Sequence, residues 1–277
     1  MSTPPFEVMG VLNVTPDSFS DGGLHLDFDR AVGHARRLVA EGAAVVDVGG
    51  ESTRPGARPV PVAEELRRVV PVIERVAPDG VPLSIDTSKL AVAEAALDAG
   101  AQMVNDVTAF RAEPEIAGLV AQRGARCCLM HMLGEPRMMQ VDPRYEDVVS
   151  EVAAFLEERL AFAVREGVPE DHVLLDPGIG FGKTLEHNLE LLRRLDEIAT
   201  LGRPVVIGVS RKSFLGLLTG RPIDQRLPAT VAANVIAFER GASVFRVHDV
   251  AAVRDALTVA QWTMGRVPAV DHGVRGW

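Results

Sequence analysis

The sequence predicts an α/β protein with a single-domain (β/α)8 fold, the TIM barrel. Its 277 residues suit this fold, which typically needs about 250. Strand-like and helical runs alternate in about eight units, and strand-like runs repeatedly end in a polar residue or glycine that opens into a loop. No linker interrupts the units. We therefore expect one domain over residues 1–277, with the aperiodic residues 265–277 as a loose C-terminal tail.

The first half of the chain supplies four of these units. Strands are expected at 6–15, 43–50, 81–89 and 101–110, and helices at 29–40, 62–77 and 89–100. Asp29 is expected to cap the first helix, since aspartate is a favoured N-cap and apolar residues follow at helical spacing. The loops at 16–27 and 51–61 exceed the roughly 2 to 6 residues usual between a strand and a helix. Both loops are predicted to close over a substrate.

The second half supplies the other four strands, expected within RCCLMHM, VLLDPGIGFGK, RPVVIGVSRKSFLG and ASVFRVHDV. The longest helix is predicted at 145–166, where one apolar stripe indicates a core-facing side. VLLDPGIGFGK, residues 173–183, is the stretch around which the chain is organised, because a buried strand delivers Asp176 to the ligand-binding edge of such a sheet. Asp-Pro-Gly is also ordinary turn chemistry. His131, after the fifth strand, is interpreted as a structural histidine.

Charge and cysteine content restrict the class of protein. Hydrophobic residues make up 47% and charged residues 24%, and the net charge is −9. An acidic chain is a poor match for nucleic acid or an anionic membrane, so we expect neither partner. The sequence has no run that could span a bilayer and no leader-like N-terminus. Cys127 and Cys128 are adjacent in a strand, which favours free thiols over a disulfide and a cytoplasmic location.

Two nucleotide-binding motifs fail in the glycine-rich stretch. A phosphate loop would need glycine where Pro177 stands, and a dinucleotide fingerprint would need glycine where Lys183 stands. The glycines of this stretch instead let the backbone approach a flat ligand, and Phe181 offers a stacking face.

Polar side chains at the predicted strand ends fall into two chemical groups. One can match a planar heterocycle that carries adjacent N–H donors and acceptors: Asp86, Asn105, Asp176 and Lys212. The other suits a phosphate or diphosphate with Mg²⁺: Asn13, Arg54, Arg246 and His248. A heterocycle that bears a diphosphate is the joint prediction, with Thr53 as a further polar residue at the same edge.

Eight motifs in this order resemble the dihydropteroate synthase family over nearly the whole chain. They are LNVTPDSFSDGG, GGESTRPGA, SIDTSK, the Asn-Asp of VNDV, HMLGEPRMMQ, DPGIGFGK, GVSRKS and FRVHDV. The resemblance implies a transferase of folate biosynthesis. Its reaction joins 6-hydroxymethyl-7,8-dihydropterin diphosphate to p-aminobenzoate and gives 7,8-dihydropteroate and pyrophosphate. It also implies a homodimer that pairs through a helix face.

The resemblance assigns roles to individual residues. The pterin pocket would comprise Asp86, Asn105, Met130, Asp176, Phe181, Gly208 and Lys212. The diphosphate side would comprise Asn13, Arg246 and His248, with Asn13 holding Mg²⁺. The p-aminobenzoate site would comprise Phe19, Thr53, Arg54, Pro55 and Ser213. Catalytic roles would belong to Arg54, Lys212, Arg246 and His248.

Three departures from the family's pattern and three rival functions accompany this interpretation. Leu133, Met138 and Pro228 stand where the family more often has glutamine, threonine and alanine, which affects loop packing and none of the expected ligands. A Schiff-base aldolase could use Lys212 as a nucleophilic amine. A pterin-binding methyltransferase would share the pterin residues without needing Arg54. A silent pterin-binding paralogue would not need the loop residues.

Overall fold

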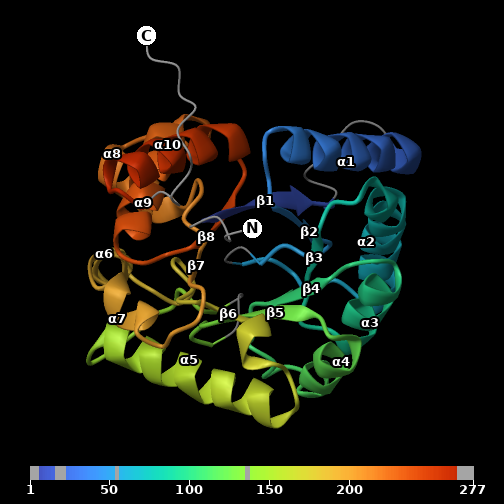
Figure 1. The fold of residues 1–277 in the computed structure, drawn as a ribbon, viewed down its shortest axis with the longest axis horizontal. Helices are drawn as coiled ribbons and strands as arrows, with labels where there is room; N and C mark the ends of the chain where they lie inside the picture. Colours follow the sequence, from blue (N-terminus) through green and yellow to red (C-terminus); the bar gives the residue numbers. More distant parts are fainter. Residues whose placement is uncertain (1–5, 16–22, 54–55, 135–137, 267–277) are drawn as a thin grey trace.

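The computed structural model describes residues 6–15, 23–53, 56–134 and 138–266, with the backbone alone described for 23–27. Its strands form one eight-stranded parallel sheet in the order β6-β5-β4-β3-β2-β1-β8-β7. The sheet closes where Leu175 of β6 bridges Val205, just before β7, and its N–H donates to the Pro204 carbonyl at 3.0 Å. Figure 1 shows the strands at the centre and the helices in a ring around them. The predicted TIM barrel is confirmed.

The eight strands are short and parallel, as the alternation of units predicts. They are β1 Glu7–Asn13, β2 Val45–Gly49, β3 Leu83–Asp86, β4 Met103–Asp106, β5 Arg126–Met130, β6 Val173–Asp176, β7 Val206–Ile207 and β8 Val244–Val247. Each lies within a run predicted from the sequence. The seventh is much shorter than its run, because only Val206 and Ile207 keep strand geometry before the backbone turns toward Lys212.

The helices lie between successive strands. They are α1 Gly23–Ala40, α2 Val62–Val76, α3 Leu90–Asp98, α4 Glu115–Arg123, α5 Val148–Arg165, α6 Leu185–Arg193, α7 Leu195–Ala199, α8 Ser213–Thr219, α9 Leu227–Glu239 and α10 Val250–Thr263. Short 3-10 turns η2 Ala77–Asp79, η3 Glu170–His172 and η4 Ile223–Gln225 complete the chain order.

One predicted helix start is wrong, and another was placed slightly too early. Asp29 does not cap α1, because the helix begins at Gly23 and Asp29 lies inside it; the apolar spacing of α1 already begins at Leu24 and Phe28. The helix expected from Tyr145 begins at Val148 instead. Asp147 caps it by accepting hydrogen bonds from the N–H groups of Val149 and Ser150 at 3.0 and 2.9 Å.

The barrel interior is layered, and this layering positions the site. A floor of buried apolar side chains fills one level: Met9, Val45, Met103, Cys128, Leu174, Val206 and Val244. Because side chains alternate between the faces of a strand, residues two positions further along each strand point inward again, one level higher. That level contains Val11, Asp47, Asn105, Met130, Asp176, Gly208 and Arg246, and Asp86 of β3 joins it as the register partner of Asn105. An apolar floor therefore carries a layer in which polar groups predominate.

The cysteines and the chain end bear on two expectations. Cys127 packs in the outer core and Cys128 in the barrel floor, so the neighbouring thiols point to opposite faces and both are free. Within the described part of the chain, no helix has the length and apolar character needed to cross a membrane. Of the predicted tail, Gly265 and Arg266 are described, and Arg266 donates to the Phe238 carbonyl at 2.8 Å; residues 267–277 lie outside the described residues.

Candidate active site

Two buried carboxylates from different strands accept hydrogen bonds from Arg246 of β8, and Asn105 joins the group through one of them. Its Nε donates to Asp47 Oδ2 at 2.6 Å and its Nη2 to Asp86 Oδ2 at 2.7 Å. Asn105 donates from Nδ2 to the same Asp47 oxygen at 3.0 Å. Burial raises the pKa of Asp86 to about 7, with the Arg246 charge opposing this shift and Asp47 adding to it. One guanidinium thus links the strands β2, β3 and β8.

Asp176 and Lys212 form a second polar group in the same layer. The backbone N–H of Gly178 donates to Asp176 Oδ1 at 2.7 Å. Lys212 Nζ donates to the Ile179 carbonyl and lies 4.4 Å from the centre of the Phe181 ring. Burial lowers the pKa of Lys212 to about 8, although Asp176 opposes the shift. Phe181 also packs against the buried cluster of Val107, Met130, Met132 and Met139.

Gly180 leaves the space that the Lys212 side chain occupies, and Gly208 lies in ordinary contact distance of its Nζ. A Cβ on Gly180 would lie 3.1 Å from Lys212 Cδ, and a Cβ on Gly208 would lie 3.8 Å from its Nζ. Gly178 has a φ of 66°, and a Cβ there would collide with the carbonyl oxygen of His131. The predicted close approach of backbone in this stretch is therefore seen against neighbouring protein groups.

The loop that carries Phe181 is fixed by bonds to its backbone. Lys183 Nζ lies 2.9 Å from His131 Nδ1 and donates to the Phe181 carbonyl at 3.0 Å. Gln140 donates to Gly180 O at 2.7 Å and Tyr145 to Gly182 O at 2.8 Å. Burial lowers the pKa of Lys183 to about 7 and that of His131 to about 2. The His131 ring is thus neutral and accepts from Lys183, which agrees with its structural interpretation.

The remaining predicted residues lie at the carboxyl ends of the strands, in the segments that follow the strands, or outside the described residues. Asn13 and Asp86 both lie beside Gly49, since a Cβ on this glycine would lie 3.5 Å from Asp86 Cβ and 3.9 Å from Asn13 Oδ1. Ser210 Oγ accepts from the His248 N–H at 3.2 Å and lies 3.0 Å from Nδ1 of its ring. Ser213 is the first residue of α8, and Thr53 is half-buried in the loop after β2. Phe19, Arg54 and Pro55 lie outside the described residues.

Two residues of this site were missing from the sequence prediction. Asp47 was read only as part of a strand, although the spacing of Val45, Asp47 and Gly49 places a carboxylate on the inward face of β2. Lys183 was considered only as the residue that stands where a dinucleotide-binding motif would need glycine. Its burial, 3% exposed, has no signal in the local sequence, because it depends on His131 from β5.

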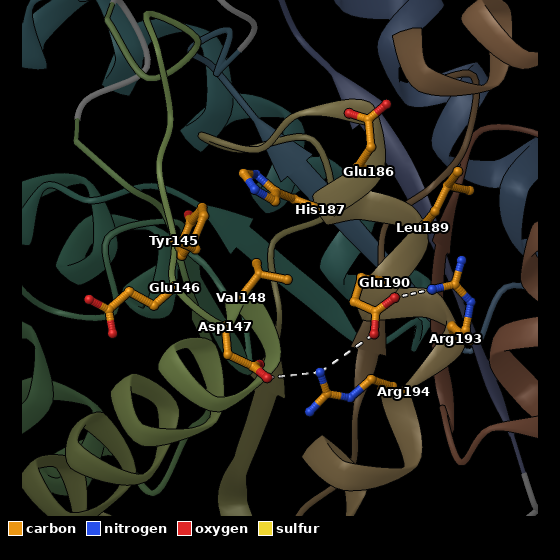
Figure 2. Close-up of a pocket in the computed structure, with 10 residues that line it drawn as sticks. All are labelled: Tyr145, Glu146, Asp147, Val148, Glu186, His187, Leu189, Glu190, Arg193 and Arg194. Atoms are coloured by element: carbon orange, nitrogen blue, oxygen red, sulfur yellow. Dashed lines mark hydrogen bonds and ion pairs between the residues drawn. The ribbon is translucent and has the colours of Figure 1, made fainter.

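A separate groove of about 490 Å³ lies on the outer wall between the start of α5 and α6 (Figure 2). Arg194 crosses it to Asp147 at 3.0 Å and to Glu190 at 3.5 Å. Tyr145, which donates to the Gly182 carbonyl of the glycine-rich loop, packs edge to face against His187, with ring centres 4.9 Å apart. The described residues contain no group of three or more histidine, cysteine or acidic side chains placed to hold a metal. The interior layer, which buries Asp47, Asp86, Asn105 and Asp176 around Arg246 and Lys212, is the better candidate for chemistry.

Comparison with known proteins supports the resemblance found in the sequence. The model of the family described as pterin binding enzyme matches residues 9–248. Dihydropteroate synthase of Mycobacterium leprae is 49% identical over 282 residues, 98% of each chain. The chain belongs to the dihydropteroate synthase family. A bifunctional folylpolyglutamate synthase/dihydropteroate synthase of Haloferax volcanii is 50% identical over 91% of this chain, which spans only 30% of that protein.

Solved dihydropteroate synthases share the fold. The enzyme of Xanthomonas albilineans with 4-aminobenzoic acid has a TM-score of 0.88 at 51% identity, over 95% of this chain and 94% of that one. The same enzyme in complex with 7,8-dihydropteroate has a TM-score of 0.85 at 48% identity, over the same shares of the two chains. The three departures are mild in this dihydropteroate synthase fold: Leu133 and Met138 are exposed, and Pro228 lies in the first turn of α9, where proline is tolerated.

Proposed function

We propose that this chain condenses 6-hydroxymethyl-7,8-dihydropterin diphosphate with p-aminobenzoate to form 7,8-dihydropteroate and pyrophosphate. The observation that carries the proposal is the polar layer above the apolar barrel floor, in which Asp86, Asn105, Asp176 and Lys212 lie together in a member of this family. The Xanthomonas structures with 4-aminobenzoic acid and with 7,8-dihydropteroate support the choice of second substrate and product.

The pterin would lie in this layer with its amino-pyrimidinone edge toward the carboxylates. Asp176 has one oxygen engaged by the Gly178 N–H, so its other oxygen can accept from a ligand N–H. Asp86 has one oxygen engaged by Arg246 and offers its other oxygen in the same way. Lys212 supplies a donor, and Met130, Phe181 and Gly208 supply flat or open walls for the ring.

The diphosphate would lie toward the rim, where Arg246 and His248 follow one another on β8 and the turn after it. The amide oxygen of Asn13 is a hard donor of the kind Mg²⁺ accepts, and a substrate diphosphate commonly supplies other ligands for this ion. Mg²⁺ would supply electrostatic stabilisation of the departing pyrophosphate. Arg246 and His248 would hold the leaving group through charge and hydrogen bonds.

The p-aminobenzoate would bind beside the loops after β1 and β2. Phe19, Thr53, Arg54, Pro55 and Ser213 are proposed to form that site, on the strength of their motifs. Loss of pyrophosphate from the pterin methylene leaves positive charge that the electron-rich dihydropterin can share. The arylamine is neutral at pH 7, so its attack needs no strong general base. We assign Arg54, Lys212, Arg246 and His248 the catalytic roles of binding and orienting these groups.

The chain is further proposed to act in the cytoplasm as a homodimer. Both cysteines of the chain are buried and free, which suits a reducing compartment. A homodimer would cover exposed apolar side chains on neighbouring elements at one side of the barrel, which are Leu217 and Leu218 of α8, Ile223 of η4 and Ile236 of α9.

Pyrophosphate release in a coupled assay tests the function directly. We expect release only when the pterin diphosphate, p-aminobenzoate and Mg²⁺ are all present, and loss of release on chelation with EDTA. Pyrophosphate release that does not depend on p-aminobenzoate would contradict the proposal.

A Schiff-base aldolase is the rival function that Lys212 suggests. Its pKa is lowered to about 8, and a nucleophilic lysine of an aldolase would share this property. Borohydride trapping of a carbonyl substrate on Lys212 would establish that rival.

A further inference from the structure

Asp47 is the most buried carboxylate in the interior layer, with no exposed surface. It comes from the middle of β2 and lies opposite Ser84 of β3 and Val11 of β1 in the sheet register. A carboxylate this deep needs strong partners, since an uncompensated buried charge is costly. Its partners are therefore informative about its role.

A single oxygen of Asp47 binds two groups that the proposed function gives to different parts of the substrate. Oδ2 accepts from Asn105 Nδ2 at 3.0 Å, on the pterin side, and from Arg246 Nε at 2.6 Å, on the diphosphate side. The other oxygen, Oδ1, is buried without a hydrogen-bond partner among the described residues. Asp47 Oδ2 thus contacts one residue of the proposed pterin subsite and one residue of the proposed diphosphate subsite.

The bond to Asn105 fixes which end of its amide faces the ligand. An ionised carboxylate can only accept hydrogen bonds, so the NH₂ end of Asn105 must point to Asp47. Its carbonyl oxygen is then turned away from Asp47 and is available as an acceptor for a ligand N–H. With the carboxylates of Asp86 and Asp176, this gives the layer three side-chain acceptors.

The bond to Arg246 fixes the guanidinium in a similar way. Nε is engaged by Asp47 and Nη2 by Asp86, so the plane of the group is set by two carboxylates from adjacent strands. An arginine oriented in advance loses less freedom when an anion binds. Asp47 needs no contact with the substrate to have this effect.

We propose that Asp47 is a positioning residue that orients Asn105 for the pterin ring and Arg246 for the diphosphate. The inference rests on the proposed function, because it takes the pterin diphosphate as the ligand. It adds to that function a residue that makes the recognition of ring and diphosphate depend on one buried carboxylate.

The test compares three variants by calorimetric binding of the pterin diphosphate with Mg²⁺ and without p-aminobenzoate. Asp47→Ala should weaken binding roughly 10- to 100-fold, because both partners lose their acceptor. Asp47→Asn should stay within about threefold of wild type, because its amide oxygen can occupy the position of Oδ2 and keep both bonds. Rescue by this variant distinguishes positioning from a need for the charge itself.

Asp106→Asn is the matched control. Asp106 is equally buried, but it faces away from the interior and holds its own turn by accepting from the N–H groups of Thr108 and Phe110 at 2.7 and 2.8 Å. This variant should unfold at a lower temperature and bind the pterin diphosphate as wild type does. Thermal unfolding of all three variants shows which of them are folded at the binding temperature.

Two results would overturn the inference. One is Asp47→Ala binding within threefold of wild type, and the other is Asp47→Asn binding as weakly as Asp47→Ala. Should Asp47→Ala fail to fold, the comparison of Asp47→Asn with Asp106→Asn still decides, since a weaker Asp47→Asn contradicts positioning by an acceptor oxygen. Failure of the proposed function is recognised separately, because wild type itself would then neither bind the pterin diphosphate nor release pyrophosphate.

Discussion

The carboxylates of the interior layer are held by the protein before any ligand arrives. The Gly178 N–H binds one oxygen of Asp176 at 2.7 Å, and Arg246 binds one oxygen of Asp86 at 2.7 Å. Each carboxylate is thereby oriented and keeps one oxygen for a ligand donor. Recognition by oriented acceptors is selective, because a ligand without a matching N–H leaves a buried acceptor unpaired.

Asp176→Asn tests this arrangement. The amide has one oxygen and one NH₂ group, so it either loses the Gly178 bond or presents a donor to a ligand donor. We expect the affinity for the pterin diphosphate to fall roughly 10- to 100-fold, the effect of one unsatisfied buried group. Isothermal titration calorimetry measures it. If the variant binds with near wild-type affinity, Asp176 does not contact the pterin.

We predict that Lys183 makes the stability of the fold depend on pH. Burial lowers its pKa to about 7 in the folded protein, while an unfolded lysine titrates near 10.5. Between these pH values the unfolded chain binds more protons, so the free energy of unfolding should rise with pH in this window, by at most about 1.4 kcal/mol per pH unit. Below pH 7 both states are protonated and the penalty of the buried charge is complete.

Lys183→Met removes this titration and should flatten the slope between pH 7 and 10 relative to wild type. Urea unfolding at several pH values measures it. Arg193→Met is the control, since Arg193 is exposed on α6 and an arginine stays charged throughout. Equal slopes in wild type and Lys183→Met would show that Lys183 is not the responsible group.

Residue roles were predictable where a side chain ends a strand and less so elsewhere. Asp86 and Asp176 are the last residues of their strands and Asn105 is the last but one of its strand, a pattern visible in the sequence. Asp47 is followed by two more strand residues and Lys183 depends on a histidine 52 positions earlier. Their importance arises from contacts between distant segments, which local pattern does not contain.

Among the elements, the loop after β2 is anchored at both ends by the partly buried Lys89. Lys89, before α3, forms ion pairs with Glu51 and with Glu65 of α2, and donates to the Val60 carbonyl at 2.8 Å. Glu51 also accepts from the Val60 N–H at 3.2 Å. The two ends of the loop, residues 51 and 60, are thus tied to one ammonium group. Fixed ends restrict where the residues between them can reach.

Arg54 lies between these anchors in sequence. If it acts on the departing diphosphate as proposed, Arg54→Ala should lower kcat on the order of 10²-fold and leave pterin diphosphate affinity nearly unchanged. Steady-state pyrophosphate release and equilibrium binding on the same variant measure both. Arg58→Ala is the matched control, since Arg58 is an exposed arginine of the same loop and should turn over like wild type. Unchanged turnover in Arg54→Ala, or an equal loss of pterin affinity, would refute the role.

At the scale of the whole molecule, alternation of strands and helices was enough to predict the barrel. The short pairing at the closing edge was not predictable, because it depends on the bridge from Leu175 to Val205 and on β7, which is much shorter than its apolar run in the sequence. The start of α1 was misplaced since Asp29 is a favourable cap residue, whereas the backbone is already helical from Gly23. The preference of aspartate for the N-cap position was outweighed at Asp29, because the apolar spacing of α1 continues on both sides of it.

One side of the barrel exposes several large apolar side chains. Leu217 is 70% and Leu218 51% exposed on α8, and Ile236 is 48% exposed on α9. Figure 1 shows these two helices next to each other, with α5 on another side of the ring. The sequence of α9, LPATVAANVIAFE, is apolar on nearly every side, which is typical of a helix buried on more than one face.

We predict that Leu217→Glu combined with Ile236→Glu converts the proposed homodimer to a monomer, because charges buried at an apolar interface are costly. Wild type should sediment as two copies of the 29.7 kDa chain and the variant as one. Val164→Glu is the control, since Val164 is a 40% exposed apolar residue on α5, away from α8 and α9. A monomeric wild type, or equal dissociation of the α5 control, would contradict this interface. Circular dichroism that matches wild type shows that a monomeric double variant has kept its fold.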